Sequence, residues 1–210
     1  MKYILLAVLT ACQLPAPLAP QSAEDATFKM LAGGSQGTAW AVSDHYLVTA
    51  GHMCDETDKY ALVTSRGERF GATLVDYVQM YPADDIAREV PEDVCLIKTD
   101  RTLSVHLTLA EDMPWVGEQV YYVGYPLGEW TKSFGVYEGD QDDDQHWNDY
   151  SFSAPCDHGA SGSAVISVHG VWGVLVRVKV VDDKVLPGTE GCVATPLSAV
   201  RDLLRANGVQ

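Results

Sequence analysis

The chain has 210 residues, 20% charged and 47% hydrophobic, which is enough to bury the core of one medium-sized domain or of two small packed lobes. This composition is that of a globular protein and excludes a largely disordered chain. A formal net charge of -15 argues against nucleic acid as a partner, because no basic stripe is present to neutralise phosphates.

The first residues are typical of a secretory signal. A lysine precedes the apolar run Ile4–Leu9, which is too short to cross a bilayer permanently. The following "LTAC" resembles the bacterial lipobox, in which the cysteine, here Cys12, becomes the lipidated first residue of the mature chain. Cleavage without lipid at a later small-residue site is the alternative, and the prolines there disfavour it. We expect a lipoprotein-type signal peptide over residues 1–11 and a Pro-stiffened tether over residues 12–26.

Short apolar runs follow the tether, separated by Gly, Asp, Asn and Pro. Runs such as "YLVTAG", "VCLIKT" and "SAVISV" are rich in Val, Ile, Tyr and Thr. Their spacing predicts an antiparallel all-β protein of sandwich or barrel type and disfavours a parallel α/β sheet. One helix is predicted near the end, where the apolar residues of "PLSAVRDLLRANG" recur at helical spacing. Ser198 is its expected cap and Gly208 its expected end.

The remaining four cysteines are an even number in a chain with a secretory signal. This indicates disulfides formed in an oxidising compartment such as the periplasm, with three possible connectivities. Metal binding is the alternative, but no two cysteines are close enough in sequence for a zinc knuckle. We therefore expect no metal and no cofactor. The four are Cys54, Cys95, Cys156 and Cys192.

Acidic residues gather in the run Asp140–Asp144. The glycine-punctuated spacing of an EF-hand is missing from it, so a solvated surface is a better interpretation than a calcium site. The wider acidic segment 138–149 is interpreted as an insertion.

A candidate nucleophile lies in "CDHGASGSAV", residues 156–165, where glycines flank Ser161 directly before an apolar run. Alone, Gly-x-Ser-Gly is more often a flexible loop than a catalytic turn. Its interpretation depends on a base. Among six histidines, His52 stands apart, because it follows the buried strand in "YLVTAGH" on small residues that allow close backbone packing.

A candidate acid is Asp93, which directly precedes the apolar strand 94–97. A carboxylate at the mouth of a buried strand is costly unless a partner satisfies it, and a histidine Nδ1–H would do so. A turn aspartate is the alternative reading, and chemistry alone leaves Asp84, Asp85 and Asp100 open.

With histidine, aspartate and serine in this order, the chain resembles the chymotrypsin-fold (trypsin-like) serine proteases, closest to the HtrA-like and glutamyl-endopeptidase-like bacterial branch. The resemblance runs from about Gly37 to Leu204. "GTAWAVSDHYLVTAGH", "EDVCLIK" and "HGASGSAVIS" resemble the family's histidine, aspartate and serine segments. "VGEQVYYVGYPLG", "GVWGVLVR" and "CVATPLSAV" resemble its later strands. Two packed six-stranded antiparallel Greek-key barrels with a C-terminal helix are implied, dividing a domain of residues 27–210 into lobes of about 27–112 and 113–210.

The resemblance implies a serine endopeptidase that hydrolyses peptide bonds through a covalent acyl-enzyme. Ser161 would be the nucleophile, His52 the general base and Asp93 its orienter, with the backbone N–H groups of Gly159 and Ser161 forming the oxyanion hole. Ala160 replaces the usual Asp or Asn, and little loss is expected because that side chain does no chemistry. The alternatives are a catalytically silent binding or scaffold protein of the cell envelope, which the complete triad disfavours, and an esterase, which nothing in the chain favours.

The resemblance also implies a substrate preference. The base of the primary pocket would be Pro155, and the cleft strand would contain Val174, Leu175, Val176 and Arg177. These residues imply a pocket for small apolar side chains of protein or peptide substrates. A cation at His158 or Arg177 could instead bind an acidic side chain.

The resemblance also implies the disulfides. Cys156–Cys192 resembles the pair that ties the nucleophile loop to a cleft wall, and Cys54 and Cys95 each follow a triad residue by two positions, so an assembled triad would pair them. An appended peptide-binding module, which many HtrA-like proteins use for trimer assembly, is absent, so a monomer is expected. We expect the protein on the periplasmic face of a bacterial membrane as a lipoprotein, or secreted.

Overall fold

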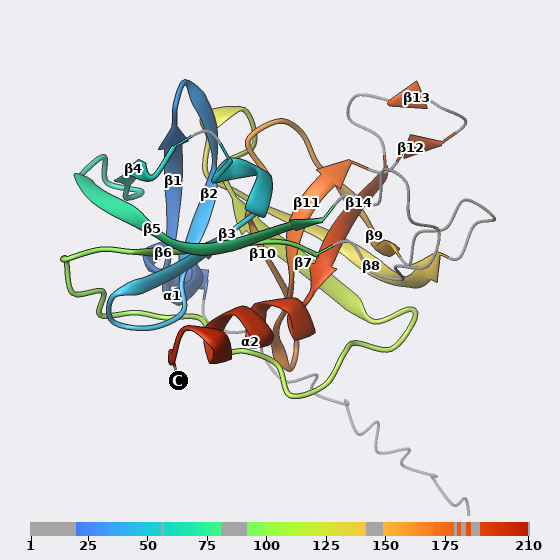
Figure 1. Cartoon of the computed structure of the whole chain (residues 1–210). Helices are drawn as coiled ribbons and strands as arrows, with labels where there is room; N and C mark the ends of the chain where they lie inside the picture. Colours follow the sequence, from blue (N-terminus) through green and yellow to red (C-terminus); the bar gives the residue numbers. More distant parts are fainter. Residues whose placement is uncertain are drawn as a thin grey trace, which may run out of the picture.

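Two closed six-stranded barrels of antiparallel strands make up most of the molecule (Figure 1). The computed structural model describes residues 20–55, 57–80, 92–141, 149–178, 180–181, 184–185 and 190–209. The strand order is β1-β2-β3-β6-β5-β4 in the first barrel and β10-β11-β14-β9-β8-β7 in the second. This architecture confirms the all-β fold class with two six-stranded antiparallel barrels.

The first barrel follows a short helix, α1 (Pro20–Asp25), and includes a 3-10 turn, η1 (Gly51–Met53). Its strands β2 and β6 are buried at consecutive positions rather than alternately. One face of each strand fills the barrel, whereas the other packs on β7 or on the C-terminal helix. The strands are β1 (Thr27–Ala32), β2 (Ser35–Ala41), β3 (Tyr46–Thr49), β4 (Lys59–Val63), β5 (Arg69–Met80) and β6 (Glu92–Lys98).

The second barrel has an aromatic core. Trp172 is fully buried, and its ring lies edge-on to Tyr137 at 5.1 Å and to Phe152 at 6.0 Å between centroids. The barrel strands are β7 (Gln119–Gly124), β8 (Thr131–Gln141), β9 (Asp149–Pro155), β10 (Ala164–Ser167), β11 (Gly170–Val178) and β14 (Glu190–Pro196). The 3-10 turn η2 (Pro126–Gly128) lies between β7 and β8, and a separate ribbon pairs β12 (Val180–Val181) with β13 (Lys184–Val185).

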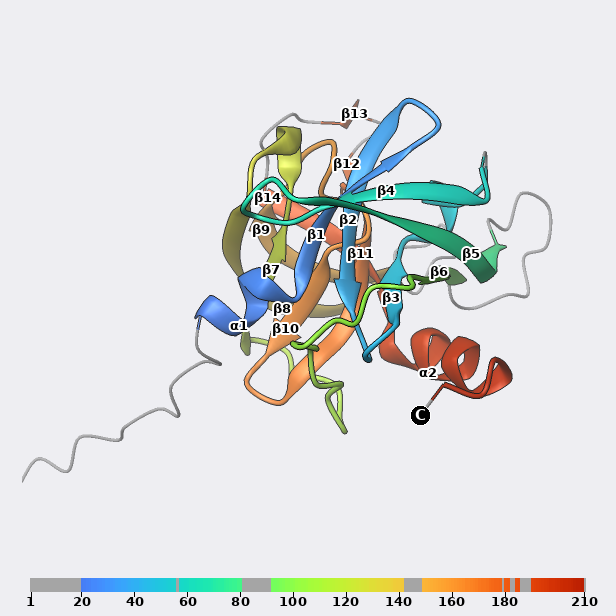
Figure 2. The ribbon, with the colours of Figure 1, turned by 90° about the vertical axis from the view of Figure 1, so that its left-hand side faces the viewer.

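The C-terminal helix α2 (Leu197–Ala206) packs on β6 of the first barrel and on β11 and β14 of the second, so it bridges the two (Figures 1 and 2). Its apolar stripe is buried, as the helical spacing predicted. The helix begins one residue before Ser198 and has Pro196 at its cap position. The expected cap was therefore wrong, because proline already fixes the extended backbone that precedes the first turn. Gly208 follows the helix with φ +66°, as expected for its end.

Several sequence predictions lie partly or wholly outside the described residues. These are the signal peptide, Cys12, most of the tether, and the alternative acids Asp84 and Asp85. Residues 138–141 belong to β8 and Asp149 begins β9, so both ends of the acidic segment are strands of the second barrel, and residues 142–148 lie outside the described residues. None of the described helices is long and apolar enough to span a membrane.

Candidate active site

His52 and Asp93 form a doubly hydrogen-bonded pair. The His52 backbone N–H donates to Asp93 Oδ1 at 2.7 Å, and His52 Nδ1 lies 2.6 Å from Asp93 Oδ2. The Asp93 side chain is 3% exposed and the His52 side chain 27%. Because a carboxylate only accepts hydrogen bonds, Nδ1 carries the proton, which leaves Nε2 as the ring's proton acceptor.

Local sequence explains why the two meet. β3 and β6 are paired so that Thr49 lies opposite Cys95, and the disulfide Cys54–Cys95, with Cα atoms 6.5 Å apart, closes the same end. Gly51 is required by close approach: a Cβ there would lie 2.7 Å from Asp93 Oδ1. The remaining candidate acid, Asp100, is exposed beyond the opposite end of β6.

The second barrel also holds this pair in place. The backbone N–H of Asp93 donates to Thr195 Oγ1 of β14 at 3.2 Å. The aspartate strand is thereby fixed from both barrels, and a carboxylate with its own backbone anchored in this way has little freedom to swing away from the imidazole.

The turn that contains Ser161 lies directly against the segment that leads to His52. Thr38 of β2 donates its N–H to Ser161 O at 2.9 Å, and Thr49 Oγ1 donates to Thr38 O at 2.7 Å. A Cβ on Gly162 would lie 2.1 Å from Thr38 O and 3.1 Å from Ala50 N, two residues before His52. Gly162 also has φ +86°, so only glycine fits both its conformation and its contacts.

The loop of residues 158–163, which contains the candidate nucleophile and is called the nucleophile loop below, has hydrogen bonds to the carbonyl groups of its first four residues. Leu127 N–H donates to His158 O at 2.7 Å, Thr38 Oγ1 to Gly159 O at 2.9 Å, and Ser163 N–H to Ala160 O at 2.9 Å. Within the described residues, neither the Gly159 nor the Ser161 N–H donates a hydrogen bond. These two donors are the ones expected to bind an oxyanion.

Thr38 and Leu127 both bind the loop that contains Ser161, and neither was predicted from the sequence. Leu127 is exposed and is the one non-glycine residue with positive φ, +53°, among the described residues. A leucine rarely adopts this conformation, and here it directs the Leu127 N–H at the nucleophile loop. The only sequence signal for it is its place between Pro126 and Gly128, a dipeptide context typical of turns.

The residues expected to shape the cleft are placed as follows. Leu175 exchanges hydrogen bonds with the nucleophile loop, accepting from Gly162 N–H at 2.7 Å and donating to Ser163 O at 2.9 Å. Val174 and Val176 are buried beside it, and Arg177 is partly exposed. Pro155 is exposed, and its carbonyl accepts bonds from Tyr122 Oη at 2.9 Å and Ser133 Oγ at 3.1 Å.

The second disulfide lies just before the turn that contains Ser161. It joins Cys156, at the end of β9, to Cys192 of β14, with Cα atoms 6.1 Å apart and both cysteines buried. Both pairings that the resemblance implied are thus present in the structure. Among the described residues, no group of three or more potential ligands could hold a metal ion.

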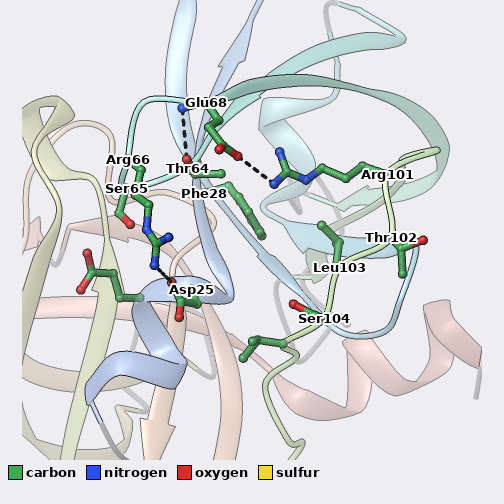
Figure 3. A pocket seen from close by; sticks show the side chains of 12 residues that line it. Asp25, Phe28, Thr64, Ser65, Arg66, Glu68, Arg101, Thr102, Leu103 and Ser104 are labelled. Carbon is green, nitrogen blue, oxygen red and sulfur yellow. Dashed lines mark hydrogen bonds and ion pairs between the residues drawn. The ribbon is translucent and has the colours of Figure 1, made fainter.

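A pocket of about 280 Å³ lies elsewhere on the first barrel (Figure 3). It is bounded by the end of α1, the β4–β5 turn and residues 101–105, and none of its lining residues belongs to the His52–Asp93–Ser161 group. Its two arginines already face carboxylates, Arg101 facing Glu68 at 2.8 Å and Arg66 facing Asp25 at 4.0 Å. The pocket is therefore separate from the candidate catalytic residues.

Two β-barrels that join a histidine–aspartate pair to a serine turn define the two-barrel serine peptidase class. The chain belongs to the trypsin-like peptidase domain family, whose profile matches residues 37–173. The expected family and enzyme class, a serine endopeptidase, are thereby confirmed. A comparison with curated protein sequences gives no significant match.

Solved structures share the fold at low sequence identity. An inactive form of Rv3671c from M. tuberculosis is 18% identical, with a TM-score of 0.70 over 90% of this chain and 89% of that chain. The active form of the Rv3671c protease is 19% identical, with a TM-score of 0.70 over 90% of this chain and 84% of that one. The serine endoprotease from Yersinia pestis is 16% identical, with a TM-score of 0.67 over 91% of this chain and 67% of that chain.

Proposed function

We propose that the protein cleaves peptide bonds with a catalytic triad of Ser161, His52 and Asp93. The observation that carries the proposal is the bonded His52–Asp93 pair, held on the segment against which the Ser161 turn packs. A serine hydroxyl is a poor nucleophile at neutral pH unless a positioned base removes its proton. His52 meets that need, because its Nδ1–H is bound to Asp93 and its Nε2 can accept.

In the first half-reaction, Ser161 Oγ forms a bond to the substrate carbonyl carbon while its proton passes to His52 Nε2. The imidazolium then gives this proton to the leaving amine as the C–N bond breaks, which leaves an ester on Ser161. In the second half-reaction, water gives its proton to His52 and attacks the ester. The bond to Ser161 breaks, and the serine regains its proton from His52.

The negative oxygen that develops in each step would be bound by the N–H groups of Gly159 and Ser161. The loss of one such donor typically costs about 3 kcal/mol of transition-state stabilisation. Asp93 holds the imidazole in the required tautomer and stabilises its charged form. Each group therefore has a distinct part in the reaction.

The substrates are proteins or peptides, with a small apolar side chain such as Ala, Val or Leu preferred in the primary pocket. Pro155 offers no carboxylate to attract a basic side chain. His158 and Arg177 could instead favour an acidic side chain. Rates of hydrolysis of substrates with Ala, Leu or Glu at the cleaved position decide between the two preferences.

Labelling with a fluorophosphonate probe tests the nucleophile. We expect the folded wild-type protein to be labelled and to hydrolyse peptides, and Ser161→Ala to do neither. A folded, mature wild-type protein that stays unlabelled would instead support the alternative, a catalytically silent binding or scaffold protein on the same fold.

We also propose export and lipid anchoring, with residues 1–11 as signal, 12–26 as tether and 27–210 as the protease domain in lobes of about 27–112 and 113–210. The last part of the expected tether is not extended, because α1 (Pro20–Asp25) is helical and packs against β1. The two disulfides indicate an extracytoplasmic protein. The anchor rests on the lipobox-like "LTAC". Labelling cells with a palmitate analogue should mark the wild type and not Cys12→Ser, and gel filtration of the domain should give a monomer.

A further inference from the structure

Thr38 is fully buried in β2 of the first barrel, and all three of its polar groups form hydrogen bonds: the N–H and the hydroxyl to the second barrel, and the carbonyl to β3 of its own barrel. Its N–H donates to Ser161 O at 2.9 Å, and its carbonyl accepts from Thr49 Oγ1 at 2.7 Å. Its hydroxyl donates to Gly159 O and accepts from Tyr125 N–H, both at 2.9 Å. One residue thus links the strand before His52, the nucleophile loop and the β7–β8 turn.

The Gly159 N–H lies in the peptide plane that joins His158 to Gly159, and the φ and ψ angles of Gly159 relate this plane to the next one. Glycine adopts both signs of φ readily, so the loop alone does not fix this donor. The plane before Gly159 is held by the bond from Leu127 N–H to His158 O, and the plane after it by the bond from the Thr38 hydroxyl. Because N–H and C=O point to opposite sides of a trans peptide, anchoring His158 O also aims the Gly159 N–H.

The Thr38 hydroxyl acts on both planes. It binds the carbonyl of the second plane directly, and through Tyr125 N–H it holds the turn that contains Leu127 and so governs the first plane. Tyr125 O also lies close to Gly159, since a Cβ on that glycine would be 2.6 Å from it. The three segments are therefore joined by direct contacts.

We propose that the Thr38 side chain is a positioning group for the oxyanion hole, an inference that rests on the proposed function. The oxyanion exists only as the tetrahedral intermediate forms, so a misdirected donor weakens binding of the transition state and not of the substrate. Loss of the hydroxyl should accordingly lower kcat and leave KM nearly unchanged.

The test compares Thr38→Val, which removes the hydroxyl and keeps the branched shape, with Thr38→Ser, which keeps the hydroxyl. Thr27→Val is the matched control. Thr27 is also fully buried, and its Oγ1 donates to a backbone carbonyl, that of Ala23 at 2.7 Å, but it has no bond to the nucleophile loop. Measurements are kcat and KM on a peptide substrate, affinity for a peptide boronic acid that forms a tetrahedral adduct on the serine, and fluorophosphonate labelling.

We expect Thr38→Val to lower kcat about 10- to 100-fold, between the loss of an ordinary hydrogen bond and the loss of an oxyanion donor, with KM within about 3-fold. Boronic acid affinity should fall in parallel with kcat/KM. Thr38→Ser and Thr27→Val should keep kcat within about 3-fold of the wild type.

Equal kcat values for Thr38→Val and Thr27→Val overturn this inference alone, as does a loss of about 10-fold or more in Thr38→Ser. The serine variant decides the question even where Thr38→Val does not fold. A folded wild-type protein that neither hydrolyses peptides nor is labelled overturns the proposed function and this inference together.

Discussion

Asp93 binds His52 at two points, accepting the backbone N–H on Oδ1 and facing the ring nitrogen Nδ1 with Oδ2. One carboxylate therefore sets both the position of the histidine backbone and the tautomer of its ring. One bond places the imidazole and the other determines which ring nitrogen carries the proton. A single substitution at Asp93 can test the role of the bond to the ring.

Asp93→Asn should lower kcat by about 10⁴ while the protein stays folded. The amide keeps the size of the carboxylate and one acceptor oxygen, but its NH₂ group cannot accept the Nδ1–H, so the ring adopts the wrong tautomer. Steady-state kinetics beside a thermal unfolding curve will measure this. Activity within about 10-fold of the wild type would show that another acid orients the ring. Asp100→Asn, at the exposed end beyond β6, is the control and should leave kcat unchanged.

Gly162→Ala should abolish folding or lower the free energy of unfolding by several kcal/mol more than Gly67→Ala. The two glycines have nearly equal φ, +86° and +83°, so both variants bear the left-handed strain of about 1–2 kcal/mol. A Cβ at residue 162 would overlap Thr38 O at 2.1 Å, whereas at residue 67 nothing lies within 4 Å. Urea unfolding of both variants gives the difference, and equal losses would mean that the packing of the Ser161 turn on β2 is not rigid.

The three candidate catalytic residues could be proposed from the sequence because each has a local signature. His52 follows a buried strand, Asp93 precedes an apolar run and is the second residue of β6, and Ser161 lies between glycines. Each pattern alone left alternatives open, and only their order along the chain, which resembles a known family, made them specific. Thr38 was missed for a physical reason: its acceptor, Gly159 O, is 121 positions away in the chain. Hydrogen bonds of that separation leave no pattern in either segment.

The fold class was predictable because most strands are short apolar runs separated by turn residues. Strands β1, β8 and β9 were not recognised as such runs. β1 contains a lysine among its apolar residues, and β8 contains two glycines and charged residues. A barrel strand needs apolar side chains on only one face, and pairing with both neighbours supplies the rest of its stability. Such strands are visible only once their partners are known.

Removal of either disulfide should cost about 2–4 kcal/mol of unfolding free energy. The separations between the joined cysteines are 41 and 36 residues, so loop-closure entropy predicts nearly equal losses for Cys54→Ala/Cys95→Ala and Cys156→Ala/Cys192→Ala. Urea titrations of both double variants test this. The wild type with both disulfides reduced by dithiothreitol should lose the sum of the two amounts of unfolding free energy. A large inequality would show that native packing at one bridge, rather than chain entropy, determines its contribution.

Two buried tyrosines should make the protein less stable at alkaline pH. Burial raises the pKa of Tyr122 and of Tyr125 to about 12, so the folded state keeps protons that the unfolded state loses, and stability falls as the pH rises from about 10 towards 12. Tyr122→Phe and Tyr125→Phe should each remove about 1 kcal/mol of the loss in unfolding free energy between roughly pH 9 and pH 11.

At neutral pH the two variants should differ in stability, because the Tyr122 hydroxyl donates to Pro155 O whereas the Tyr125 hydroxyl has no partner among the described residues. We expect Tyr122→Phe to lower the free energy of unfolding by about 1 kcal/mol and Tyr125→Phe to leave it unchanged. Urea unfolding at neutral pH measures both, and equal losses would contradict this assignment of hydrogen bonds.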